Sequence, residues 1–204
     1  ARNRRRTAIT LSAVALNTAV LVATLALMRG MEHDMTRAAT RFLVGDIQAH
    51  ARGYLAERSF YDSLAKPEAL LLAAASQHFA ATPRSYGYGL ISRNTKSAGA
   101  TFIGVRPDAE RRTFELHREL RTGNYLGNEA RREVVIGTTL ARSLQASVGT
   151  EIVAVVQAAD GSLGTDLLRV TGVLKAVGDE IDRGGVFMHA TDFEHIDPRL
   201  GTED

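Results

Sequence analysis

Apolar residues are concentrated in one long run near the amino terminus. The segment Thr7–Met28 carries no charged residue and consists mainly of Ala, Val, Leu and Ile. At about 1.5 Å per residue, a helix of this length spans ~33 Å, which is enough for a hydrocarbon core of about 30 Å. A soluble core helix keeps a polar stripe, and the apolar part of a cleaved signal peptide is shorter. The pattern therefore predicts a retained transmembrane helix over residues 7–28.

Helical spacing continues beyond this run. Apolar residues between Met31 and Ala39 recur at intervals of three to four, and Gly45 is the next residue that favours a helix end. We therefore expect a helical stalk over residues 29–44.

Short alternating runs and turn residues follow the stalk and predict interleaved strands and helices. The expected strands are Asp46–Ala51, Tyr86–Ser92, Ala100–Val105, Glu133–Gly137, Ile152–Ala158, Leu167–Leu174 and Val186–Met188. The expected helices are Glu68–Phe79 behind Pro67, a helix from Pro107 through Leu120 ended by Gly123–Asn124, a helix through Leu144 capped by Thr138 or Thr139, and a short helix Asp192–His195. The fold class expected for residues 45–195 is therefore α+β, a mixed α/β domain, with residues 196–204 as a polar linker.

Composition and charge define the setting of this domain. The chain is 45% hydrophobic and 24% charged, as in globular proteins, and has no Cys, which excludes disulfides, cysteine-ligated zinc and thiol catalysis. Residues 1–6 hold four arginines, and such clusters stay in the cytoplasm. We therefore expect a cytoplasmic amino terminus in the inner membrane and a periplasmic main domain. The net charge of +2 changes sign without these arginines, so no nucleic-acid partner is expected.

Candidate catalytic residues form no recognisable frame. The segment His189–His195 has ligand-type side chains without a standard zinc spacing, and Asp192 or Thr191 can instead cap a surface helix. Asp179, Glu180 and Asp182 can pair as acid and base, or form a solvated loop. Gly137 and the two threonines after it lack the lysine of a phosphate loop. We expect no enzyme activity, no metal and no cofactor in this chain.

Two features point to interaction rather than chemistry. Asn17 lies in the middle of the apolar run, where an amide either contacts another membrane helix or is tolerated by itself. The hairpin turn Asp160, Gly161, Ser162 with Leu163 is the other feature, and it is either a plain turn or a partner-docking element.

An ordered series of segments resembles the first membrane helix and exported domain of an FtsX-like, MacB-type ABC transporter permease, and in particular its lipoprotein-releasing (Lol-type) branch. The segments are Gly45–Leu55, Pro83–Arg84, Ser97–Ala100, Gly104–Glu110, Gly123–Leu126, Val135–Gly137, Leu140–Leu144, Val148–Gly149, Val170–Val173, Asp182–Arg183 and Val186–Met188. The resemblance covers nearly all of residues 7–195.

The resemblance implies a MacB-like periplasmic domain made of a porter-like α/β subdomain and a strand-rich subdomain. It also implies a second permease subunit, identical or different, and a separate cytoplasmic ATPase subunit that supplies the energy. The chain starts with Ala and stops at the polar Asp204, so we expect part of a longer permease with further membrane helices.

In the Lol-type branch a protruding loop docks a periplasmic lipoprotein carrier protein, and the turn at Asp160–Leu163 is its nearest equivalent here. Two alternatives use the same anchored domain. One is the sensor of a membrane signalling receptor, and the other is a membrane-anchored hydrolase. The first needs a signalling domain after a second span, and the second needs a convergent catalytic cluster.

Overall fold

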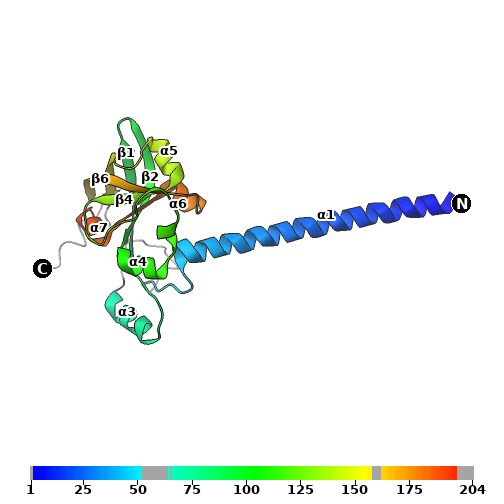
Figure 1. The fold of residues 1–204 in the computed structure, drawn as a ribbon, viewed down its shortest axis with the longest axis horizontal. Coiled ribbons are helices and arrows are strands. Elements are labelled where there is room, and N and C mark those ends of the chain that lie inside the picture. The colour runs from blue at the N-terminus through cyan, green and yellow to red at the C-terminus, as the bar shows by residue number, and fades with distance from the viewer. Residues whose placement is uncertain (1, 52–63, 65, 158–161, 197–204) are drawn as a thin grey trace. The chain divides into compact units, whose positions relative to one another are not determined.

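The computed structural model describes residues 2–51, 64, 66–157 and 162–196, which fall into two compact units, residues 1–40 and 41–204. The first unit consists of helix α1 (Arg2–Ala39), drawn in blue in Figure 1. Within Asn3–Glu32 of α1, an 18-residue window has a mean hydropathy of 2.0 and none of it is buried, and α1 is the one helix among the described residues that is long and apolar enough to cross a membrane.

The hydroxyl groups of α1 are hydrogen-bonded to the backbone of their own helix. Thr7, Thr10, Thr18 and Thr24 each donate to the carbonyl four residues earlier, at 2.9–3.0 Å. These bonds satisfy polar groups that hydrocarbon cannot solvate. The threonines therefore do not argue against a membrane span.

The π-helix η1 (Thr40–Val44) follows α1 without a break, and Gly45 ends it with a φ of +67°. Residues 29–44, for which a helical stalk is expected, are thus helical throughout. The expected strand Asp46–Ala51 is wrong, because these residues are irregular and Asp46 through His50 are exposed. Alternation alone was misleading here, since a strand also needs a neighbour to pair with.

The second unit is a seven-stranded sheet covered by short helices. Its elements are α3 (Pro67–Ser76), β1 (Arg84–Arg93), β2 (Lys96–Val105), α4 (Pro107–Thr113), η2 (Leu116–Arg118), β3 (Leu120–Gly123), β4 (Glu133–Ile136), α5 (Thr138–Leu144), β5 (Glu151–Gln157), β6 (Leu163–Leu174), α6 (Asp179–Gly184), β7 (Gly185–His189) and α7 (Ala190–Ile196). This is the mixed α+β class expected from the sequence.

The sheet closes on itself. Its strand order is β3-β6-β4-β7-β2-β1-β5, and β5 pairs again with β6. The twelve-residue strand β6 makes this possible, because Leu163–Arg169 pairs with β5 whereas Arg169–Val173 pairs with β4. The pairs β2 with β7 and β4 with β6 are parallel, and the other pairs of the sheet are antiparallel. In Figure 1, α3 lies at the end of this unit opposite the β1–β2 turn.

Alternate residues of the same strands build two cores. Phe102, Val134 and Val186 belong to one core, which α5 and α7 complete with Leu140 and Phe193. The next residue along each strand (Ile103, Val135 and Phe187) belongs to the second core, which Leu116 and Ile181 complete. This two-residue period is that of a sheet buried on both faces.

Helix boundaries are where the sequence predictions fail most. The helix from Pro107 ends at Thr113, and residues as far as Gly123 form η2 and β3 instead, because Leu120 pairs with Leu174. Helix α5 begins after Gly137 and has no side-chain cap from Thr138 or Thr139. The helix behind Pro67 ends at Ser76 rather than Phe79, because His78 has a φ of +61°.

Candidate functional sites

Charged side chains are buried where η1 meets the sheet. Arg84, the first residue of β1, donates to the carbonyl of Phe42 at 3.2 Å and to that of Leu43. The same guanidinium binds Glu110 of α4, with Nε 3.3 Å from Oε2 and Nη2 in contact with Oε1. The two side chains are only 6% and 1% exposed. We call these residues, together with Phe114, the η1 junction.

The chemistry of the η1 junction follows from the end of the helix. Carbonyls in the last turn of a helix have no partner within the helix, and a buried cation can satisfy them. The Arg84 guanidinium carbon also lies 3.8 Å from the centroid of the Phe114 ring, a cation–π contact. Burial works to lower the pKa of Arg84, but the hydrogen bonds and the charge of Glu110 outweigh it, so the pKa is raised. Arg84 is therefore a permanent charge.

A second ion pair lies beside this one at the surface. The Nε of Arg41 donates to Oε2 of Glu115 at 3.0 Å, and the Glu115 amide donates to the carbonyl of Arg41 at 3.3 Å. Both side chains are exposed. The hydrogen bond from Arg41 lowers the pKa of the Glu115 carboxyl, and it outweighs the opposing effect of burial.

The β5–β6 hairpin is present as predicted, with Gln157 opposite Leu163 at its described end. Of the predicted docking residues, Asp160 and Gly161 lie outside the described residues. Ser162 is half-buried, and the side chain of Leu163 is 66% exposed.

Leu163 belongs to a larger apolar surface. Tyr88, Leu90 and Leu167 also point outward and are 43%, 55% and 50% exposed. Leu90 is directly opposite Val155, and Val153 is directly opposite Leu167, so the three strands carry one continuous patch. We call it the hairpin face; its members are Tyr88, Leu90, Val153, Val155, Leu163 and Leu167.

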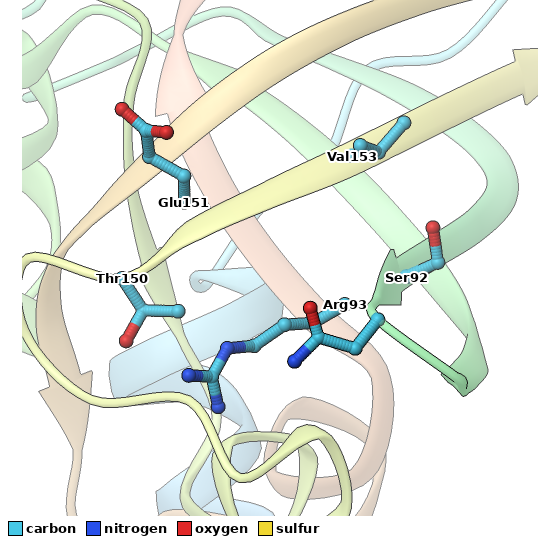
Figure 2. A pocket seen from close by; sticks show the side chains of 6 residues that line it. Ser92, Arg93, Thr150, Glu151 and Val153 are labelled. Carbon is cyan, nitrogen blue, oxygen red and sulfur yellow. The ribbon is translucent and has the colours of Figure 1, made fainter.

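A polar pocket of about 390 Å³ lies at one end of β1 and β5 and is lined by Ser92, Arg93, Asn94, Thr150, Glu151 and Val153 (Figure 2). In Figure 2 the Arg93 guanidinium points toward Thr150, and the Glu151 carboxylate points away from it. Arg93 donates to the Gln145 carbonyl, and Glu151 binds Arg169 at 3.4 Å. Arg93 and Glu151 therefore each bind another group and do not form an ion pair with each other.

Residues 7–202 match the family model of the MacB-like periplasmic core domain. The chain belongs to this family. It therefore contains a periplasmic domain of the kind found in MacB/FtsX-type ABC transporter permeases, as the sequence resemblance implied.

No curated protein matches the chain. Among solved structures, the extracellular domain of the noncanonic ABC-type transporter YknZ from Gram-positive bacteria aligns at 12% identity with a TM-score of 0.42. The alignment covers 55% of this chain and 55% of the YknZ domain.

The MacB-like family is a transporter family, and two of the candidate acids of this member are buried with structural contacts. Asp192 is buried and accepts a hydrogen bond from the backbone N–H of Arg132 at 2.9 Å, so its prediction as a helix cap is wrong. Asp182 is buried in α6 and accepts from the Val177 N–H at 3.1 Å, so the prediction of a solvated loop fails for it. Within the described residues, no three His, Cys, Asp or Glu side chains could hold a metal ion.

Sequence reasoning missed the η1 junction. Arg84 and Glu110 are 26 residues apart, and neither belongs to a motif. One signal was available, since each lies in a segment that carries the MacB-like resemblance. These two segments meet in space, so part of the resemblance corresponds to a contact within the domain.

Proposed function

We propose that this chain is the first membrane helix and periplasmic domain of a Lol-type permease subunit. In this proposal residues 1–6 are cytoplasmic, residues 7–28 span the inner membrane, residues 29–44 form a stalk and residues 45–195 form the periplasmic core. A separate ATPase subunit drives the release of a lipoprotein or another amphiphile. The family match supports a transporter and gives no support to the sensor alternative.

The observation that carries this proposal is the η1 junction. Movement of a membrane helix can act on a periplasmic domain only through a connection that resists deformation. The chain enters the domain through η1, and the buried Arg84 holds the carbonyls of Phe42 and Leu43 while Glu110 holds Arg84. A buried charge that loses its partners is costly, so Phe42 and Leu43 of η1 resist separation from Arg84 and Glu110.

The test is a reconstituted transporter that contains the complete subunit and its ATPase. Arg84→Gln should reduce ATP-driven release of lipidated cargo by about tenfold or more while ATP hydrolysis persists, because the loss of a charged hydrogen bond costs about 1.5–3 kcal/mol. Arg41→Gln, which removes only the exposed pair, is the matched control. Normal release by a folded Arg84→Gln transporter would contradict coupling through this junction. Failure of an ATPase to copurify with the complete subunit would contradict the permease proposal itself.

The hairpin face is the proposed docking site of a periplasmic carrier protein. Its outward-facing neighbours Ser92, Gln157 and Thr165 are uncharged, and the ion pair of Glu151 with Arg169 lies at one end of the face, so contact with the partner would be made through apolar and uncharged side chains. Exposed apolar patches on a soluble domain commonly mark interaction sites. A photocrosslinking amino acid at Leu163 should capture the purified carrier, whereas one at the exposed Arg118 should not. Equal capture at both positions would contradict docking at the hairpin face.

Asn17 is the proposed contact with a neighbouring membrane helix. Within the described part of the chain its amide makes no hydrogen bond of the kind that the four threonines of α1 make. An interhelical amide contact in a membrane is worth about 0.5–2 kcal/mol. Asn17→Leu should therefore weaken permease dimers in neutral detergent, and Thr18→Val should not. An unchanged dimer fraction in Asn17→Leu would count against this contact.

A further inference from the structure

A second pocket, of about 250 Å³, lies between the edge strand β3 and helix α5. Its rim holds Arg121 and Thr122 of β3, Arg142 of α5 and Ser147, and its floor includes the buried Ala141 and Val173. We call it the β3–α5 pocket. Nothing in the proposed transport function uses it.

The position of Arg121 is set by an irregularity of the backbone. The register between β3 and β6 shifts between Leu120 and Thr122, so Arg121 is the extra residue of a bulge. Bulges re-aim side chains and are frequent at functional sites. Because β3 lies at an end of the strand order, Arg121 is at the accessible side of the sheet.

The rim is fixed on its other side by Gln145. This residue ends α5 with a φ of +52°, a conformation that costs energy for a residue other than glycine. Its amide donates to the carbonyls of Ala141 and Arg142, and its own carbonyl accepts from Arg93. Contacts to both the backbone N–H and the carbonyl of Gln145 therefore hold the end of α5 beside Arg142.

The charged side chains that line the pocket are all positive. No carboxylate lines it, and Arg142 donates to a neutral acceptor, the Thr139 hydroxyl, at 3.1 Å. Neither Arg121 nor Arg142 forms an ion pair within the described residues, whereas Arg118, Arg131, Arg169 and Arg183 all do. Two guanidinium groups with hydroxyls beside them suit the oxygens of a phosphate group, which arginine can bind in a bidentate manner.

We propose that the β3–α5 pocket binds a phosphate group, either free phosphate or the headgroup of an anionic phospholipid. The buried alanine and valine of the floor leave room for the uncharged part of a phosphate ester. The inference rests on the residues of the pocket and not on the proposed transport, so each can fail without the other.

The absence of Cys allows a single fluorescent label to report on this site. Val148 is 45% exposed and next to the Ser147 of the rim, so an environment-sensitive dye on Val148→Cys is suitable. The labelled full chain in neutral detergent is titrated with inorganic phosphate and with dihexanoyl-phosphatidylglycerol, and dihexanoyl-phosphatidylcholine is the zwitterionic comparison. The test variant is R121Q/R142Q. The matched control is R118Q/R131Q, which removes the same charge from paired arginines.

We expect the Kd of phosphate or of phosphatidylglycerol to rise about tenfold or more in R121Q/R142Q and less than about twofold in R118Q/R131Q. A response to phosphate identifies a free anion as sufficient, and a response to phosphatidylglycerol alone identifies the lipid headgroup. Ser147→Asp, which adds a negative charge at the rim, should weaken binding in the same way. The proposal is overturned if neither probe changes the fluorescence, if both double variants weaken binding equally, or if phosphatidylcholine binds as well as phosphatidylglycerol.

Discussion

At the η1 junction charged side chains are buried, whereas on the hairpin face large apolar side chains are exposed. Arg84 and Glu110 are 6% and 1% exposed, and Leu90 and Leu163 are 55% and 66% exposed. Both regions reverse the usual distribution of polar and apolar residues. The core of the same domain follows that distribution, with Ile91 and Phe102 fully buried.

The two regions differ in how far the domain encloses their side chains. At the η1 junction each buried charge has its partner within the domain, so the cost of burial is offset inside the chain. On the hairpin face Leu90, Leu163 and Leu167 are 55%, 66% and 50% exposed. The charges of the first region are therefore satisfied within this chain, and the exposed side chains of the second form the surface that the docking proposal uses.

The largest expected effect comes from removing one charge of the buried pair. Glu110→Ala leaves Arg84 buried without its carboxylate, and we expect it to lower the free energy of unfolding by about 3–5 kcal/mol. The measurement is urea unfolding of the full chain in neutral detergent, followed by circular dichroism. Glu115→Ala, which breaks the exposed pair with Arg41, should have a much smaller effect. Equal losses in the two variants would remove the distinction between a structural and a surface pair.

Leu167 and Leu168 are adjacent in β6 and face opposite sides of the sheet, so variants at the two positions compare these sides. Leu168 is fully buried and Leu167 is 50% exposed. Leu168→Ala should lower the free energy of unfolding by about 2–5 kcal/mol, because it leaves a cavity in the core. Leu167→Ala should change it by no more than about 0.5 kcal/mol. A large loss of stability in Leu167→Ala would show that the hairpin face is packed by part of this chain and is not an open surface.

The backbone beneath the hairpin face gives the next prediction. A Cβ at Gly89 would lie 2.0 Å from the carbonyl oxygen of Val155, whereas a Cβ at Gly99 would meet no atom within 4 Å. Gly89→Ala should therefore destabilise the domain by about 1–3 kcal/mol through overpacking. Gly99→Ala on the neighbouring strand is the control and should be neutral in the same unfolding assay. If both variants are neutral, β1 and β5 are not closely paired.

The sequence was informative where structure depends on local pattern. Strands β1, β2, β4, β5, β6 and β7 all overlap predicted strands, because alternation and turn residues are local signals. Helix α1 was predictable because an uncharged apolar run of that length is typical of a membrane-spanning helix and not of a core helix in a soluble protein. The β5–β6 hairpin followed from the turn residues between two apolar runs.

The remainder depends on contacts between distant residues. Leu120 looked helical in the periodicity after Pro107 but is a strand residue, because Leu174 of β6 lies opposite it. The closure of the sheet by β6, and the meeting of Arg84 with Glu110 and with two carbonyls of η1, have no local signature at all. Asp192 shows the same limit, since its partner Arg132 is 60 residues away.

The smallest expected effect is the titration of Glu115 at the surface beside the η1 junction. Its pKa is lowered by the hydrogen bond from Arg41, and the charge of Arg118 contributes less. A lowered pKa in the folded state means that the ionised carboxylate stabilises the fold. This contribution is present above the pKa of the unfolded chain, and it is lost as the pH falls through the folded pKa.

Carboxyl ¹³C chemical shifts of the full chain in micelles should therefore give a Glu115 pKa that rises in Arg41→Gln. The rise in Arg118→Gln should be smaller, because the Nη1 of Arg118 is 4.0 Å from the carboxylate. If Arg118→Gln shifts the pKa more than Arg41→Gln does, Arg41 is not the main partner of Glu115. The surface pair that lies beside the η1 junction would then be Glu115 with Arg118 rather than with Arg41.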